Sequence, residues 1–317
     1  MKNLLFIDFG ASRVKSIEYD VEKDIFCKQK ETPSPFLYKD TMSKSEVRNI
    51  LTNVMKKHDS FDAVFICTIL GGGYVDDVYY SWKSSKNIKN KTCLISHIFK
   101  HDPTYHLHKD HGGTEDRVKQ LGTFNGKTIY SSLGDTDCVK RSFLLKNDEC
   151  IVNLGTGSQV IRNKSITKYI PSGRALNCFE NFFRSLDVDM FEIFKNLSVD
   201  KLMTSDMIFN LNIFEQALYY DPTVCGSITN IREDNFTLIN FTCSLFKNYL
   251  DQYIPLIKDS KKIYLTGGIS RKYPVIKEYF KAKTNAEVIL NSRHVEDTFL
   301  GIKEKVLADY EHINNRI

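Results

Sequence analysis

Residues 4–19 read LLFIDFGASRVKSIEY, and this stretch decides how the rest of the chain is interpreted. The apolar run at 4–7 has the length of a buried strand, so Asp8 falls where that strand leaves its sheet. Gly10 allows a tight reversal, and residues 16–19 alternate between polar and apolar like a second strand. The stretch therefore predicts a β-hairpin whose tip carries a carboxylate, backbone N–H groups, a hydroxyl and two cations.

A hairpin tip of this kind can bind a phosphate. Backbone N–H groups and the cations would face the phosphate oxygens, while Asp8 would hold a magnesium ion through water. P-loops and dinucleotide-binding loops run from a strand into a helix and contain more glycine, so they do not match. An Asp-x-Gly turn also occurs in hairpins that bind nothing, and this stretch alone leaves both interpretations open.

Three more turns follow the first hairpin along the chain. Residues 150–161 (CIVNLGTGSQVI) again read as a strand, a Gly-Thr-Gly turn and a strand. Residues 263–270 (IYLTGGIS) place two glycines between a strand and a helix-like run. Residues 133–137 (LGDTD), between the first two hairpins, add a carboxylate just after a strand-like run. Four turns in this order favour a ligand site over unrelated loop turns.

The four turns resemble those of the actin-like ATPase superfamily, in which two similar domains present phosphate hairpins to one nucleotide. The closer resemblance is to the FGGY carbohydrate kinases, above all the sedoheptulokinase-like ones. The first phosphate motif matches at Asp8, Gly10, Ser12 and Lys15, although Ala11 stands where a threonine is common. The other motifs match at Gly134-Asp135 (catalytic base), Gly155-Thr156-Gly157 (second phosphate) and Thr266-Gly267-Gly268 (adenosine). Weaker similarities lie at 80–83, 169–174, 226–228, 235–237 and 296–301.

The resemblance implies an α/β fold of two actin-like (ribonuclease H-like) domains with a nucleotide and sugar cleft between them. Alternating strand and helix patterns in each half predict the same class. The 317 residues, 42% of them hydrophobic, are enough for two cores. We place the first domain at 1–148 and the second at 149–317. Helical spacing of apolar residues predicts helices at 45–57, 179–194, 236–257 and 296–310.

The resemblance also implies an ATP-dependent kinase that transfers the γ-phosphoryl group to a hydroxyl of a ketose or polyol. Asp135 would be the general base, with a helix N-cap as its structural alternative and Asp137 as the rival base. ATP and Mg²⁺ are the implied cofactors, and Asp8 would hold the metal ion through water. The phosphates would be bound at Gly10, Ser12, Lys15, Gly155, Thr156 and Gly157, and adenosine at Gly267 and Gly268, where a Cβ would block its approach.

Trp82, the only tryptophan, falls where the resemblance places the sugar site. An indole face packs well against the C–H face of a sugar, and core packing is the alternative role. Serine at 84 and 85 replaces the acidic residue of the family, and the first domain is short, so the sugar itself does not follow from the resemblance. A non-catalytic actin-like domain that binds a nucleotide or sugar as a sensor or scaffold is the alternative function.

Composition narrows the classes of partner. The formal net charge of +5 is small and no Lys/Arg cluster is interleaved with aromatics, so we expect no nucleic acid. No apolar stretch approaches the length of a membrane span. Eight cysteines without a C-x-x-C pair, and no signal peptide, predict a cytoplasmic protein. The sequence leaves the oligomeric state open, with a homodimer as one alternative. His106, His108 and His111 suggest either a metal site or an exposed loop.

Overall fold

The predicted hairpin is present at the start of the chain. β1 (Asn3–Phe9) pairs antiparallel with β2 (Arg13–Asp20), in a register that puts Asp8 opposite Lys15. β1 runs further than predicted, because Phe9 pairs with Val14 and both side chains are buried in the core. Asp8 therefore lies inside the strand rather than beyond its end.

The computed structural model divides the chain into two compact units. The first comprises Met1–Leu144 and His294–Ile317, and the second comprises Leu145–Arg293. The structure describes residues 1–10, 13–34, 39, 41–68, 73–75, 78–80, 120–131, 134–155, 157–162, 165–170, 172–212, 225–291 and 294–309. Within this described part, no helix combines the length and the apolar character that crossing a membrane requires.

The first unit is built on a six-stranded sheet in the order β3-β2-β1-β5-β9-β8. β1, β5 and β9 run parallel, and the remaining neighbours are antiparallel. A small sheet in the order β4-β7-β6 belongs to the same unit. The further strands are β3 (Ile25–Pro33), β4 (Thr41–Ser43), β5 (Ala63–Thr68), β6 (Gly73–Val75), β7 (Val78–Tyr80), β8 (Gln120–Phe124) and β9 (Lys127–Ser131).

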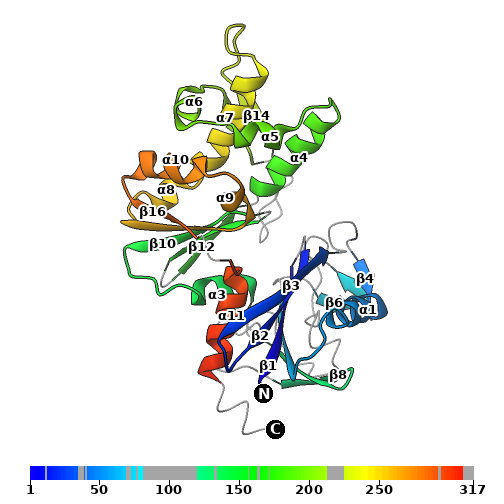
Figure 1. Ribbon diagram of the computed structural model, residues 1–317. Helices are drawn as coiled ribbons and strands as arrows, with labels where there is room; N and C mark the ends of the chain where they lie inside the picture. Colours follow the sequence, from blue (N-terminus) through cyan, green and yellow to red (C-terminus); the bar gives the residue numbers. More distant parts are fainter. Residues whose placement is uncertain are drawn as a thin grey trace. The chain divides into compact units, whose positions relative to one another are not determined.

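Alternate side chains of β1 supply two separate cores, because successive strand residues point to opposite faces of the sheet. Leu5, Ile7 and Phe9 pack with α1 on one face. Leu4 and Phe6 pack with α3 and α11 on the other. Figure 1 shows α1 and α11 on opposite sides of the sheet. These helices are α1 (Lys44–Met55), α3 (Asp135–Arg141) and α11 (Asp297–Ala308).

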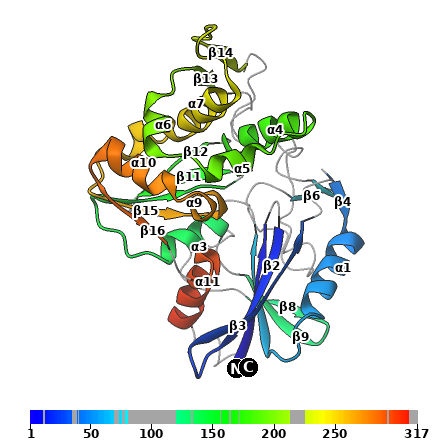
Figure 2. The ribbon, with the colours of Figure 1, turned by 45° about the horizontal axis from the view of Figure 1, so that its top comes forward.

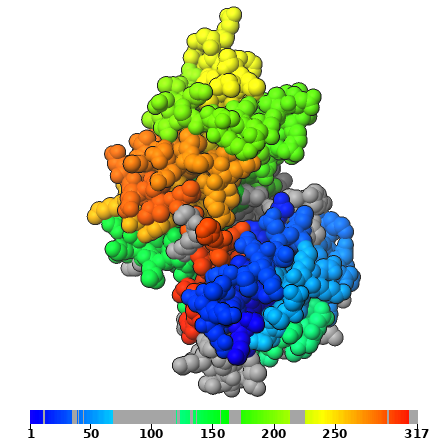
Figure 3. Space-filling model, viewed as in Figure 1, coloured from blue at the N-terminus to red at the C-terminus, as the bar shows by residue number. Residues whose placement is uncertain are grey.

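Helix α11 joins the first unit although it comes last in the chain. Its Phe299, Ile302 and Val306 are fully buried in the core that contains Leu4 and Phe6. Figure 3 shows this red end of the chain beside the blue first strands. The structure thus differs from the predicted domains 1–148 and 149–317, because the apolar side of α11 completes the first core and not the second.

The second unit repeats the plan of the first. Its five-stranded sheet has the order β12-β11-β10-β15-β16, with an antiparallel β12-β11-β10 meander followed by parallel β15 and β16. In the first unit, β3-β2-β1 is followed in the same way by β5 and β9. This agrees with the predicted pair of similar α/β domains. The strands are β10 (Glu149–Asn153), β11 (Ser158–Arg162), β12 (Ser165–Ile170), β15 (Lys262–Thr266) and β16 (Glu287–Leu290).

Helices and a two-stranded sheet complete the second unit. α9 contacts β15 and α10 contacts β16, as Figure 2 shows. The predicted helix at 179–194 is two helices, because the chain turns between them at Asp187, whose φ is 57°. The elements are α4 (Ser172–Arg184), α5 (Met190–Lys195), α6 (Val199–Thr204), α7 (Leu238–Asp251), α8 (Ile254–Ile257), α9 (Gly268–Lys272), α10 (Val275–Thr284), β13 (Ile208–Asn210) and β14 (Ser227–Thr229).

Candidate functional site

The turn between β1 and β2 brings a carboxylate and an ammonium group together. Asp8 is 7% exposed, and its buried Oδ1 atom has no hydrogen-bond partner among the residues that the structure describes. The turn is closed by the N–H of Gly10, which donates to the carbonyl of Arg13 over 3.1 Å. A Cβ at Gly10 would lie 2.8 Å from the same carbonyl oxygen, so a larger residue would force this turn open.

Burial raises the pKa of Asp8 to about 7. The ammonium of Lys15 opposes this effect, whereas the negative charges of Asp135 and Glu296 add to it. The shift follows from the cost of burying a charge that no hydrogen bond compensates. A cation near Asp8 would remove that cost. The buried, unpartnered oxygen thus fits the predicted water-mediated magnesium site.

Lys15 forms its ion pair with a residue from the far end of the chain. Its Nζ lies 2.5 Å from Oε2 of Glu296, and the two side chains are only 22% and 20% exposed. Glu296 is the N-cap residue of α11, and its side chain makes no capping hydrogen bond. The sequence placed Glu296 in a weak motif at 296–301 but did not assign it to the site. Nothing in the local sequence indicates that it meets Lys15.

Asp135 begins α3, and the N-cap position belongs to Gly134. Asp135 is the first residue inside the helix, so the predicted alternative role of Asp135 as N-cap is wrong. Asp135 is half-buried, and its charge raises the pKa of Asp8, which places both carboxylates in one neighbourhood of the first unit. Asp137, the rival base, is also half-buried, and burial raises its pKa although Lys140 opposes the shift.

Two thiols lie beneath the carboxylates of the first unit. Cys67 on β5 pairs in register with Asp8, and Cys138 is one turn along α3 from Asp135. Their sulfur atoms are 3.9 Å apart, and both residues are fully buried. Burial raises the pKa of the Cys67 thiol. Both cysteines belong to the same apolar core as Leu4 and Phe6, on the face of the sheet packed by α3 and α11.

The two turns of the second unit are bonded to each other. The N–H of Leu154 donates to the carbonyl of Thr266 over 2.9 Å, and the N–H of Ile269 donates to the carbonyl of Leu154 over 3.2 Å. The Gly155 N–H donates to Oγ of Ser158 over 3.3 Å. The predicted second phosphate turn and the predicted adenosine turn thus form one surface at the ends of the parallel strands β10 and β15.

The structure gives the two glycines of the adenosine turn different roles. Gly267 has a φ of 91°, and a Cβ on it would lie 2.3 Å from the carbonyl oxygen of Leu154. The close crossing of these two backbones therefore requires glycine there, whether or not a ligand binds. A Cβ on Gly268 would meet no atom within 4 Å from the described residues outside its own helix and chain neighbours. Of the two, Gly268 is the one whose missing side chain leaves open space.

Solved structures resemble the fold of this chain, although no family model and no curated protein matches it. A ligand-bound xylulose kinase from Lactobacillus acidophilus is similar, with a TM-score of 0.69, 13% identity, and coverage of 97% of this chain and 89% of that one. For gluconate kinase from the same organism the TM-score is 0.67, with 12% identity and coverage of 96% and 89%. Plasmodium falciparum glycerol kinase with ADP is similar with a TM-score of 0.60 and 11% identity, over 98% of this chain and 90% of that one.

The chain has the actin-like fold of these sugar kinases. The activator of the 2-hydroxyisocaproyl-CoA dehydratase from Clostridium difficile, with bound ADPNP, is also similar, with a TM-score of 0.52 and 10% identity over 99% of this chain and 98% of that one. At these identities the comparisons establish the fold alone. The roles of individual residues in the sugar kinase fold of this chain rest on their own geometry.

Several of the residues singled out from the sequence lie outside the described part of the chain. They are Ser12, Trp82, Thr156, His106, His108 and His111. Asp8, Gly10, Lys15 and Asp135 come together in the first unit, and Gly155, Gly157, Gly267 and Gly268 come together in the second. Among the described residues, no group of three or more His, Cys, Asp or Glu side chains is arranged to hold a metal ion directly.

Next to Lys15 lies a row of three buried, hydrogen-bonded side chains that the sequence did not predict. Oγ of Ser16 lies 2.8 Å from Nε2 of His58, and Nδ1 of His58 lies 3.0 Å from Oε1 of Glu18. Burial lowers the pKa of His58 although Glu18 opposes the shift. All three residues are buried, and Ser16 and Glu18 stand on β2. We interpret these hydrogen bonds as structural, since they connect β2 to the segment that follows α1.

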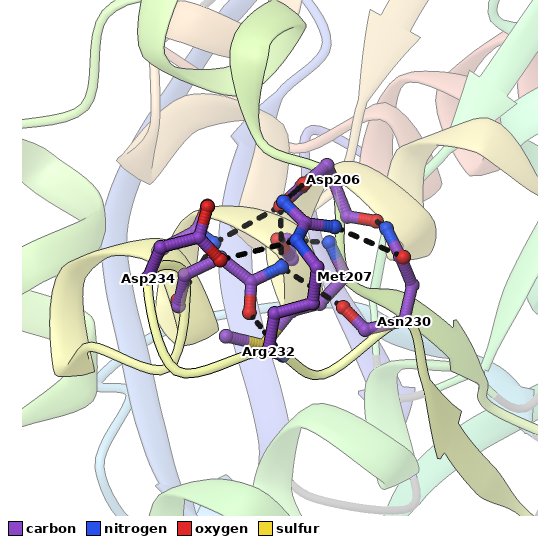
Figure 4. A network of polar contacts seen from close by, with 8 residues as sticks. Asp206, Met207, Asn230, Arg232 and Asp234 are labelled. Atoms are coloured by element: carbon purple, nitrogen blue, oxygen red, sulfur yellow. Dashed lines mark hydrogen bonds and ion pairs between the residues drawn. The ribbon is translucent and has the colours of Figure 1, made fainter.

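A second polar network lies on the surface of the second unit. Arg232 donates to Asp206 over 2.6 Å and to Asp234 over 3.1 Å, as Figure 4 shows. Its third contact is Oδ1 of Asn230, over 3.0 Å. Asn235, from one of the weak motifs of the sequence, donates to Asp206 as well. The network fixes the loop that leads into α7.

Proposed function

We propose that the protein is an ATP-dependent carbohydrate kinase that phosphorylates a hydroxyl of a ketose or polyol. The observation that carries the proposal is the group of Asp8, Lys15 and Asp135 in the first unit of a sugar kinase fold. Transfer of a phosphoryl group requires positioning, neutralisation of charge and a base for the acceptor. In this proposal Asp8 positions the metal-bound water, Lys15 neutralises phosphate charge and Asp135 is the base. The similarity to xylulose, gluconate and glycerol kinases supports the same class.

Each unit carries turns that we assign to the binding of MgATP. The metal ion would neutralise phosphate charge when bound, and Asp8 is the residue that would orient its water. Lys15 and Ser12 would donate to the phosphates from the first unit. Gly155, Thr156 and Gly157 would do so from the second, and Gly267 and Gly268 would face adenosine.

Asp135 would act as the general base toward the sugar. As the hydroxyl oxygen bonds to the γ-phosphorus, its proton would pass to the carboxylate of Asp135, and ADP would leave. The position at the start of α3 leaves the side chain outside the capping role. Trp82 would pack against the carbohydrate.

The decisive experiment is a screen of sugars and polyols for ADP formation in the presence of ATP and Mg²⁺. A thermal-shift screen of the same compounds runs beside it, because a ligand that binds the folded protein stabilises it. ADP formation that depends on one sugar class supports the kinase. Binding of nucleotide or sugar without transfer would instead establish a sensor or scaffold, and no binding of ATP would reject both.

We also propose a cytoplasmic location, with a small-molecule carbohydrate as partner and neither nucleic acid nor membrane. Seven cysteines fall in the described part of the chain and all are free thiols, which suits a reducing compartment. Fractionation of cells that express the protein at native level tests the location.

A further inference from the structure

Lys15 lies near the carboxylates of Asp8 and Glu296. It forms its ion pair with Glu296, which is the more distant of the two in sequence. Asp8 stands directly opposite it across the β1–β2 ladder. The ion pair nevertheless goes to Glu296, over 2.5 Å, and Oδ1 of Asp8 accepts no hydrogen bond from the described part of the chain. The choice of partner therefore decides what Asp8 can bind.

A lysine side chain has four flexible bonds and can turn toward either acid. The charge of Lys15 acts on Asp8, because it opposes the rise in the pKa of that carboxyl. Without Glu296, the ammonium would turn to Asp8 and occupy the oxygen that is now unpartnered. An ammonium has three donors, so one bond to Glu296 leaves two for another anion.

We propose that Glu296 is a positioning residue for MgATP: it holds the ammonium of Lys15 away from Asp8, so that Lys15 can donate to a phosphate and Asp8 can hold metal-bound water. The proposal rests on the proposed function and deepens it. Glu296 acts through Lys15 and touches neither the sugar nor the reacting phosphorus.

The fold holds Glu296 firmly in this place. It is followed by α11, whose Phe299 and Ile302 are fully buried in the first core. A Cβ on Gly301 would lie 1.9 Å from the carbonyl oxygen of Cys138, so α11 and α3 pack with their backbones in close contact at this glycine. Glu296 makes no side-chain cap to α11, and replacing it therefore removes no helix cap.

The test is a double-mutant cycle read by calorimetric binding of MgATP to the full chain. We compare the unmodified protein with Glu296→Gln, Lys15→Met and the double variant. Glu296→Gln keeps the size of the side chain and should weaken binding about fivefold, the order expected for a partly exposed charged pair. In the Lys15→Met background the same change should have no effect. Glu296→Asp, which keeps the charge, should restore part of the affinity.

Two controls separate positioning from a general loss of structure. Glu304→Gln changes an exposed acid on the same helix and should leave MgATP binding unchanged. The thermal shift produced by the sugar that the screen identifies should be equal in Glu296→Gln and the unmodified protein, since Glu296 is not assigned to the sugar. Thermal melts without ligand check that each variant is folded.

Each outcome has a definite reading. Unchanged or tighter MgATP binding by Glu296→Gln would overturn the positioning role and leave the kinase proposal intact. An equal loss in the Lys15→Met background would overturn it too, because Glu296 would then act without Lys15. If the unmodified protein binds no MgATP, the proposed function fails and this role fails with it.

Discussion

At the residue scale, Asp135 is the residue on which the enzyme proposal depends. Asp135→Asn keeps the size of the side chain but cannot accept the hydroxyl proton. We expect sugar phosphorylation to fall about 10²–10⁴-fold, the usual contribution of a positioned base. Calorimetry should show unchanged MgATP affinity, and thermal melts should show unchanged stability, because Gly134 and not Asp135 is the N-cap. A variant that retains its full rate would transfer the role to Asp137.

Asp8 gives a prediction about stability and pH. Its pKa of about 7 in the folded protein lies above the ordinary value of 3.8, so the folded state holds the proton more tightly than the unfolded chain. The stability contributed by protonated Asp8 is fully present below about pH 4 and is lost as the pH rises through 7. Asp8→Asn should remove this loss and raise the melting temperature at pH 8 by about 2–4 °C or more.

The check is a pair of thermal melts at pH 5 and pH 8, without Mg²⁺, for the unmodified protein and for Asp8→Asn. The difference between the two proteins should be larger at pH 8. The same variant should bind MgATP more weakly, because an amide is a poorer partner for metal-bound water than a carboxylate. Melting curves that differ equally at both pH values would contradict the raised pKa.

At the scale of elements, the crossing of α3 and α11 depends on one glycine. Gly301→Ala would put a Cβ 1.9 Å from the carbonyl oxygen of Cys138, and the two helices would have to separate. We expect a loss of about 1–3 kcal/mol or more in the free energy of unfolding, as for other over-packed sites. Urea denaturation measures it. Because Glu296 is the N-cap residue of α11 and Asp135 is the first residue of α3, MgATP binding should weaken as well.

Gly268→Ala is the matched change in the second unit, at the first residue of α9. Its Cβ would meet open space, so stability should change by no more than about 0.5 kcal/mol. If adenosine approaches the backbone here, calorimetry should show weaker ATP binding by this stable variant. Unchanged affinity would remove Gly268 from the proposed adenosine site. Gly267→Ala cannot serve this purpose, since its clash with Leu154 would disturb the turn itself.

At the scale of the whole molecule, we expect the two units to differ in their ability to fold as isolated fragments. The core of the second unit draws its residues only from 150–290, whereas one core of the first needs both 4–138 and 299–306. A fragment of residues 145–293 should therefore fold alone, with a cooperative melt and dispersed amide signals. A fragment of residues 1–144 should not, because it lacks Phe299, Ile302 and Val306. Burial of those three side chains is worth about 5–8 kcal/mol, comparable to the stability of a domain.

Much of this organisation was determined by local sequence. The run at 4–19 specified its own hairpin, because strand alternation and a glycine reversal are local properties, and residues 150–161 specified the second one in the same way. The motif order at Asp8, Gly134-Asp135 and the two later turns was enough to predict the fold class. Boundaries were less exact where packing overrode the pattern, as at Phe9, which extends β1 because it is buried.

The tertiary structure alone decided which distant residues meet. Glu296 pairs with Lys15 across 281 positions of sequence, and no local pattern encodes that encounter. Helix α11 belongs to the first unit because its apolar face fills a core that residues 1–144 leave incomplete. Gly267 is required by the nearby carbonyl of Leu154 and not by its own turn alone. The physical reason is common to all three: a local pattern fixes which face of an element is apolar or charged, but packing fixes what lies against that face.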